Sequence, residues 1–128
     1  MKEKEYRLKT LFWEATLRCN AFCEFCGSRC GEVSCNEISG EKIEKVFEDI
    51  ADAYNPGSIM INVTGGEPIL RKDLFEVITK ASAMGFPWGM VSNGSLIDKC
   101  TIQKMKQSGM KTISISLDGM EETHNRLR

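Results

Sequence analysis

The sequence predicts an α/β fold in which parallel strands alternate with helices, and two observations carry this prediction. Four short runs rich in bulky and β-branched residues are separated by segments whose apolar residues repeat at helical spacing. A parallel return between neighbouring strands needs a connection of about a dozen residues or more, which a single helix supplies. The 128 residues are enough for one domain at most.

The first predicted strand covers residues 11–17 and leads into a loop that contains five of the six cysteines. The first helix follows this loop, with Ser39 as its N-cap and Glu41 in its first turn. Its apolar stripe consists of Ile43, Val46, Phe47, Ile50 and Tyr54. A proline and a glycine within residues 55–57 end this helix.

Three further strands and helices follow in alternation. The second strand, at residues 58–63, precedes a helix that Gly85 closes. The apolar face of that helix consists of Leu74, Val77, Ile78 and Ala81. The third strand covers residues 87–91, and the third helix covers residues 98–108 and stops at Gly109. The fourth strand, at residues 111–117, alternates Ile with Ser or Thr, and a fourth helix begins near Glu121.

Composition and charge exclude several classes of partner. The 17 Lys and Arg residues nearly balance the 18 Asp and Glu residues, without a long run of either sign, so we expect no nucleic acid and no anionic membrane surface as partner. No apolar run approaches the roughly 20 residues of a membrane span, and the charged start lacks the apolar core of a signal peptide. We therefore expect a cytoplasmic protein, in which clustered thiols bind metal more often than they form disulfides.

Four polar or glycine-rich motifs follow the four predicted strands. They are the cysteine loop, Gly65-Gly66-Glu67-Pro68, Ser92-Asn93-Gly94 and Ser116-Leu117-Asp118-Gly119. The carboxyl ends of parallel strands share one edge of a sheet, and ligand sites of α/β folds lie there. The motifs are therefore expected to surround one pocket, although each glycine is also explained by a simple turn between strand and helix.

The spacing Cys-x3-Cys-x2-Cys at Cys19, Cys23 and Cys26 offers three thiolates to one metal centre. Structural zinc and iron–sulfur sites are normally closed by four protein ligands, so three ligands indicate a centre with an exchangeable fourth position. Cys30 and Cys35 are the alternative, because a fourth thiol would make a ferredoxin-like electron carrier or a closed zinc centre. Cys100, in the third helix, is not expected to be a ligand.

The other motifs carry groups that suit a small polar ligand. Adjacent glycines at 65 and 66 let the backbone approach a ligand, and Pro68 stiffens the segment that presents Glu67, whose carboxylate accepts hydrogen bonds from an ammonium group. The remaining polar groups suit a ribose or an amino-acid head group. They belong to Ser92, Asn93, Ser116 and Asp118.

The cysteine triplet after the first strand, followed by Gly65-Gly66-Glu67-Pro68 after the second, resembles the radical S-adenosylmethionine (radical SAM) superfamily. In that family three thiolates hold a [4Fe–4S] cluster, and S-adenosylmethionine (SAM) chelates the fourth iron through its amino and carboxylate groups. Reductive cleavage of SAM gives a 5′-deoxyadenosyl radical that abstracts a hydrogen atom from the substrate. The resemblance implies both cofactors and an electron donor such as flavodoxin or ferredoxin.

The resemblance also implies a role for each motif. Cys19, Cys23 and Cys26 would ligate the cluster, and Phe25 would pack near the adenine of SAM. The SAM ammonium would be received by Gly65, Gly66 and Glu67. Ser92 and Asn93 would help to hold the nucleoside or methionine part of SAM. Ser116 and Asp118 would lie at the positions of the carboxylate or ribose contacts.

The family core is a partial (β/α)6 TIM-like barrel, of which this chain supplies about four units. Residues 1–128 are therefore expected to be the N-terminal portion of a radical SAM core domain, without the last strands and any C-terminal auxiliary domain. The open edge of the fourth strand is expected to favour self-association. A folded but catalytically inert half-domain that binds a partner chain remains an alternative.

The substrate class is predicted from the segment around the fourth strand. Ser116-Leu117-Asp118-Gly119, followed by His124-x3-Arg128, resembles the branch that contains peptide- and protein-modifying maturases, many with C-terminal auxiliary-cluster domains. A peptide or protein substrate is the first interpretation. Small-molecule or cofactor biosynthesis, including tetrapyrrole modification, uses the same core and is the alternative.

Overall fold

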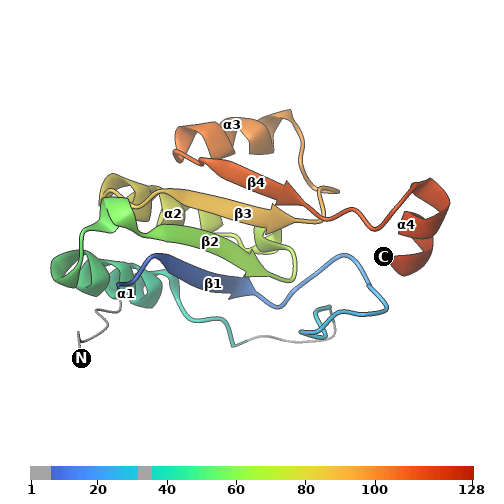
Figure 1. The fold of residues 1–128 in the computed structure, drawn as a ribbon, viewed down its shortest axis with the longest axis horizontal. Coiled ribbons are helices and arrows are strands. Elements are labelled where there is room, and N and C mark those ends of the chain that lie inside the picture. The colour runs from blue at the N-terminus through green and yellow to red at the C-terminus, as the bar shows by residue number, and fades with distance from the viewer. Residues whose placement is uncertain (1–6, 32–35) are drawn as a thin grey trace, which may run out of the picture.

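The computed structural model describes residues 7–31 and 36–128 (Figure 1). Four strands form one parallel sheet in the order β1-β2-β3-β4, with β1 at Thr10–Thr16, β2 at Met60–Gly65, β3 at Trp88–Ser92 and β4 at Thr112–Ile115. The helices between and after them are α1 (Gly40–Ala53), α2 (Leu74–Ala83), α3 (Lys99–Gln107) and α4 (Glu121–Leu127), with short 3-10 turns η1 (Pro56–Ser58) and η2 (Pro68–Leu70). The predicted parallel α/β alternation is confirmed.

β1 and β3 are each shifted by one residue from the prediction, whereas β2 and β4 differ from it by two residues at an end. β2 starts at Met60 instead of residue 58, because Asn55 caps the turn η1 by accepting a hydrogen bond from the Gly57 amide at 3.1 Å. β4 is shorter than the predicted 111–117. It pairs with β3 as far as the Ser92–Ile115 pair, and both strands end there.

The helix ends follow the predicted signals. Ser39 occupies the N-cap position of α1 but makes no side-chain capping hydrogen bond. Asp98 caps α3 by accepting a hydrogen bond from the Thr101 amide at 2.7 Å. Gly85 and Gly109 follow α2 and α3 with φ of 105° and 78°, a left-handed conformation that favours glycine.

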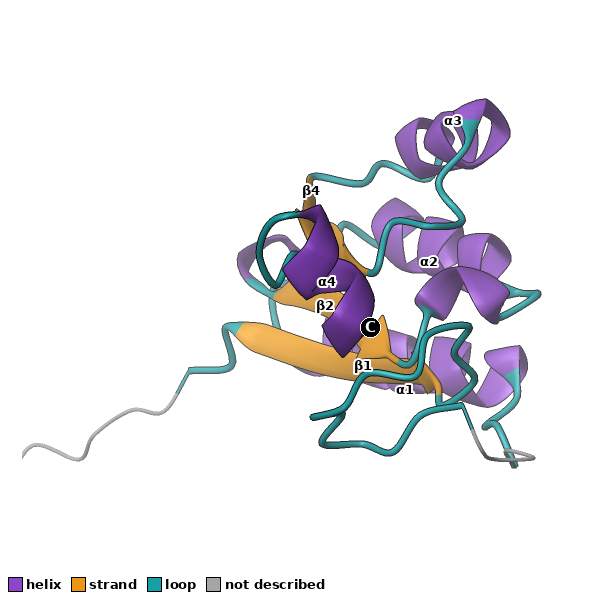
Figure 2. Cartoon of the chain, turned by 90° about the vertical axis from the view of Figure 1, so that its right-hand side faces the viewer, coloured by secondary structure: helices purple, strands orange, loops and turns teal. Residues whose placement is uncertain are grey.

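The core lies between one face of the sheet and the helices α1, α2 and α3, which all lie on that face (Figure 2). The strands contribute the buried residues Trp13, Ala15, Ile61, Val63, Trp88 and Met90. Trp13 packs edge-on against Phe47 of α1 at 5.9 Å between ring centroids. The predicted apolar stripe of α1 is only partly correct. The helix lies beside β1, so only a narrow strip of its surface faces the core. Val46 and Tyr54 are 50% and 52% exposed.

The opposite face of the sheet is uncovered in the described part of the chain. Phe12 of β1 and Val91 of β3 are exposed, and within residues 7–31 and 36–128 β4 pairs only with β3. The strand ends point toward the viewer in Figure 2, where α4 lies in front of them. Among the described helices, none has the length and apolar character needed to cross a membrane.

Candidate SAM and cluster site

The loops that follow the four strands line one cavity of about 190 Å³. This confirms that the predicted motifs meet at the carboxyl edge of the sheet. The lining includes nine of the predicted site residues: Cys19, Cys23, Cys26, Phe25, Gly65, Gly66, Ser92, Asn93 and Ser116. Glu67 and Asp118 do not line this cavity, and Arg128, which was not predicted as a site residue, does.

The two glycines after β2 bring this loop against the segment that leads to Cys19. Gly65 has a φ of 126°, and a Cβ at this position would overlap the carbonyl oxygen of Thr16. A Cβ on Gly66 would overlap the carbonyl oxygen of Arg18. The Gly66 amide donates to the Thr16 carbonyl at 2.7 Å, and the Glu67 amide donates to the Arg18 carbonyl at 2.9 Å. The close contact between the loop after β2 and the segment that leads to Cys19 therefore requires glycine at both positions.

Glu67 lies behind the cavity wall, with a relative exposure of 0%. Its carboxylate oxygens lie 3.0 and 3.1 Å from the Ser92 hydroxyl, which donates to them. The backbone amides of Asn93 and Ile69 also donate to it, at 2.8 and 3.4 Å. These hydrogen bonds compensate for the removal of a carboxylate from water. Glu67 thereby ties the end of β2 to the end of β3.

Asn93 connects the end of β3 to the cysteine loop. Its side-chain amide donates to Asn20 Oδ1 at 2.9 Å, and Asn20 Nδ2 donates to Ser95 Oγ at 2.9 Å. The Ser95 amide and hydroxyl both donate to Asn93 Oδ1, at 2.9 and 2.7 Å. Asn20 and Ser95 were not predicted as site residues, because no sequence pattern pairs positions more than 70 residues apart.

The three predicted cluster ligands are free, partly buried thiols. Cys26 Sγ accepts a hydrogen bond from the Cys30 amide at 3.4 Å, and Cys19 Sγ accepts one from the Ala21 amide at 3.4 Å. Backbone hydrogen bonds from Cys30 and Ser28 lower the pKa of Cys26 below its ordinary value. A lower pKa increases the thiolate fraction, which is the metal-binding form.

The pKa of Cys30 is shifted in the opposite direction to that of Cys26. Its side chain is buried, and burial together with the nearby Cys26 raises its pKa to about 11. In the metal-free chain, Cys30 is therefore harder to deprotonate than Cys26. Cys35, the other alternative fourth ligand, lies outside the described residues, and Cys100 is exposed on α3.

The helix α4 brings Arg128 to the cysteines. The Glu24 amide donates to the Leu127 carbonyl at 3.1 Å, and Arg128 Nη1 lies 3.5 Å from Cys23 Sγ. The Arg128 guanidinium forms an ion pair with Asp118, which raises the pKa of Arg128. The Asp118 side chain thus faces Arg128, and the Arg128 guanidinium lines the cavity. The His124-x3-Arg128 spacing was the only sequence signal for this residue.

The donor set fits an iron–sulfur cluster. In the described part of the chain, no three or more His, Cys, Asp or Glu side chains surround a position for a single metal ion. A cluster takes its thiolates on different irons, so its ligands stand farther apart than the ligands of one ion. Three free thiols line one cavity, and Cys19, Cys23 and Cys26 would hold the cluster.

Comparison with known proteins relates the chain to enzymes of tetrapyrrole and peptide chemistry. It is 36% identical over 117 residues to the Fe-coproporphyrin III synthase of Methanosarcina barkeri, covering 91% of this chain and 29% of the relative. It is 34% identical over 122 residues to the AdoMet-dependent heme synthase of Nitratidesulfovibrio vulgaris, covering 94% and 32%. The PqqA peptide cyclase of Bradyrhizobium diazoefficiens is 28% identical over 110 residues, covering 85% and 28%. The chain thus spans about a third of the length of these curated relatives.

Solved structures share the fold. Streptococcus suis SuiB bound to S-adenosylmethionine superposes with a TM-score of 0.78 at 19% identity, covering 94% of this chain and 28% of SuiB. Native anSMEcpe with bound AdoMet superposes with a TM-score of 0.75 at 24% identity, covering 94% of this chain and 35% of anSMEcpe.

The radical SAM superfamily pattern matches residues 13–128, which include the cysteine triplet and all of the described helices and most of each strand. Members of this family use a [4Fe–4S] cluster and SAM, and they are enzymes. Because the match covers nearly the whole chain, the protein belongs to the radical SAM superfamily.

Proposed function

We propose that this chain forms the part of a radical SAM enzyme that binds the [4Fe–4S] cluster through Cys19, Cys23 and Cys26 and binds SAM beside it. The observation that carries the proposal is the single cavity lined by these thiols and by the ends of β2, β3 and β4. When bound, the two cofactors together supply reductive cleavage of the sulfonium C–S bond and the radical that abstracts hydrogen.

The protein groups around the cavity orient SAM. Phe25, an exposed aromatic ring at the cavity, offers a stacking surface for adenine. The SAM ammonium is attracted to the wall formed by Gly65 and Gly66, with the Glu67 carboxylate directly behind it. Glu67 acts here through its charge, because its side chain is buried and its oxygens are held by Ser92 and Asn93.

The ends of β3 and β4 hold the remainder of SAM. Ser92, Asn93 and Ser116 line the cavity from these two strands and offer hydroxyl and amide groups to the ribose and methionine parts. Asp118 contributes by holding Arg128 at the same cavity. The electron that starts the reaction would come from a donor protein such as flavodoxin or ferredoxin.

Anaerobic reconstitution with iron and sulfide tests the proposal. The chain is expected to gain the visible absorption of an iron–sulfur cluster, to change its EPR spectrum when SAM is added, and to form 5′-deoxyadenosine under a reductant. Cys23→Ala is expected to abolish cluster content and SAM cleavage, whereas the matched Cys30→Ala variant is expected to keep both. A cluster without SAM cleavage would indicate an electron carrier, and loss of the cluster in Cys30→Ala would contradict the three-thiol assignment.

For the substrate, we infer a tetrapyrrole precursor as the first candidate. The relatives with 36% and 34% identity are named for porphyrin and heme products, and a pre-heme d1 synthase of Dinoroseobacter shibae is 29% identical over 119 residues. Peptide modification is the second candidate. It is favoured by the PqqA peptide cyclase relative and by the shared fold with SuiB, which has been solved bound to its precursor peptide SuiA.

Substrate binding is tested with the reconstituted chain. Titration with iron coproporphyrin III is expected to shift the Soret absorption at one equivalent, and SAM is expected to tighten this binding. A precursor-type peptide serves as the competitor. Binding of the peptide in place of the porphyrin would reverse the order of the two candidates.

A further inference from the structure

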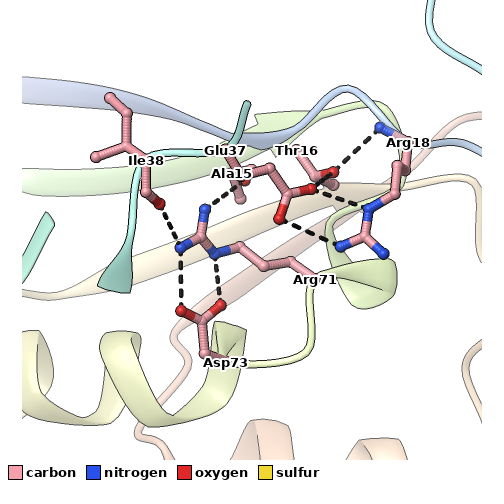
Figure 3. A network of polar contacts seen from close by, with 7 residues as sticks. All are labelled: Ala15, Thr16, Arg18, Glu37, Ile38, Arg71 and Asp73. Atoms are coloured by element: carbon pink, nitrogen blue, oxygen red, sulfur yellow. Dashed lines mark hydrogen bonds and ion pairs between the residues drawn. The ribbon is translucent and has the colours of Figure 1, made fainter. Parts of the chain in front are cut away.

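A buried guanidinium joins both ends of the loop that carries the cysteines (Figure 3). Arg71, directly after η2, is only 4% exposed, and each of its three nitrogens has an acceptor. Nη1 donates to the Ala15 carbonyl at 2.8 Å, and Nη2 donates to the Ile38 carbonyl at 2.8 Å. Nε and Nη2 also donate to the two Asp73 carboxylate oxygens at 2.7 and 3.1 Å.

The two carbonyls lie on either side of the cysteine loop, which we define as residues 17–37. Ala15 belongs to β1, two residues before the loop starts, and Ile38 comes one residue after the loop ends. Arg71 is itself four residues after Glu67, so the same side chain connects the loop to the segment that continues from Gly65 and Gly66. Its guanidinium carbon also lies 5.3 Å from the ring centroid of Trp13.

A second ion pair connects the two ends of the loop in the same region (Figure 3). Arg18, directly before Cys19, donates from Nε and Nη2 to the two carboxylate oxygens of Glu37 at 2.9 and 3.3 Å. The Thr16 hydroxyl donates to Glu37 as well. This pair is more exposed than Arg71, so its contribution is smaller than that of the buried guanidinium.

We propose that Arg71 is a positioning residue for the cluster site: it fixes the separation between the two ends of the cysteine loop and so places the three thiols before iron binds. A loop whose ends are held has fewer conformations to lose when it binds a ligand. The planar guanidinium reaches two carbonyls and a carboxylate at once, in a geometry that the point charge of Lys does not reproduce. The inference rests on the proposed function in that the thiols are taken as cluster ligands.

The test compares Arg71→Met and Arg71→Lys with Lys72→Met, an exposed neighbour that serves as the matched control. Hydrogen exchange of the metal-free chain is measured first. In Arg71→Met, the amides of residues 17–31 are expected to exchange about tenfold faster or more, whereas those of β2 and β3 keep their relative protection. In Arg71→Lys, the exchange rate of these loop amides is expected to lie between the rates in Arg71→Met and in the parent chain. In Lys72→Met, it is expected to match that of the parent chain.

Iron retention is measured next, after anaerobic reconstitution and against a competing chelator. Arg71→Met is expected to hold iron about tenfold more weakly and to show altered EPR g values, with partial rescue by Lys. A general packing role would lower protection throughout the sheet and leave the g values unchanged. Unchanged loop exchange and iron retention in folded Arg71→Met would overturn the proposal.

The same measurements still test the proposal in two further cases. If Arg71→Met fails to fold, Asp73→Asn replaces it, because this variant keeps the guanidinium and removes a charge from its carboxylate partner. The same loop-specific exchange is then required to support the proposal. If even the parent chain binds no cluster, the proposed function fails, but loop-specific exchange in the metal-free variants still supports or contradicts the ordering of the loop by Arg71.

Discussion

Substitution of Glu67 by Gln tests whether both oxygens of this buried side chain accept hydrogen bonds from backbone amides. Gln has nearly the same shape as Glu, so the change creates no cavity. It replaces one acceptor oxygen by an NH2 group, which donates. In the folded chain the two carboxylate oxygens receive the backbone amides of Asn93 at 2.8 Å and of Ile69 at 3.4 Å. One of these amides must therefore face the new NH2 group.

The cost follows from which amide loses its acceptor. The less costly orientation keeps the Gln oxygen on the Asn93 amide and turns the NH2 toward Ile69, where the original hydrogen bond is longer. One buried N–H without an acceptor costs about 1–3 kcal/mol. With a urea m-value of about 2 kcal/mol/M, a loss of about 2 kcal/mol lowers the unfolding midpoint by about 1 M.

The assay is urea unfolding of the metal-free, reduced chain, followed by the fluorescence of the two buried tryptophans, Trp13 and Trp88. Glu76→Gln is the matched control, because the Glu76 side chain is 69% exposed on α2 and pairs only with Lys80 in the described residues. The control is expected to leave the midpoint unchanged. A Glu67→Gln midpoint equal to that of the parent chain would refute the reasoning that the carboxylate accepts from both amides.

Three further outcomes are expected. Gly65→Ala should lower the free energy of unfolding by about 1–2 kcal/mol or more, because its positive φ is strained for Ala and a methyl group would overlap a carbonyl, while Gly27→Ala, with open space around it, should leave the melting temperature unchanged. At about pH 8, iodoacetamide should modify Cys26 faster than Cys30, as read by mass spectrometry, and equal rates would contradict the opposite pKa shifts. Burial raises the pKa of Asp73, but the hydrogen bond and charge of Arg71 outweigh burial, so the pKa lies below its ordinary value. The ionised Asp73 therefore stabilises the fold at pH values above the ordinary carboxyl pKa, and this stabilisation is lost as the pH falls through the lowered pKa. The stability loss in Asp73→Asn should therefore shrink in acid unfolding curves below about pH 4, and a loss independent of pH would disagree.

The sequence alone determined the fold class and the meeting of the motifs at one edge of the sheet. Apolar periodicity is a local property, so Leu74, Val77, Ile78 and Ala81 identified the buried face of α2 without knowledge of its neighbours. The parallel order followed from helical connections between strands, and the shared edge followed from the parallel order. Cys19, Cys23 and Cys26 were predicted as metal ligands from their spacing, which depends only on a single loop.

Only the tertiary structure decided what the polar and glycine residues contact. Glu67 lies behind the cavity wall, Asp118 faces Arg128, and Gly66 accommodates the carbonyl of Arg18, none of which the motifs specified. Nothing in the sequence distinguishes Arg71 from other charged residues. In the structure it is buried against the carbonyls of Ile38 and Ala15, which lie 33 and 56 residues away in the chain. The physical reason is that such contacts depend on the distance and orientation between separately formed elements, whereas sequence patterns encode which face of each element is apolar.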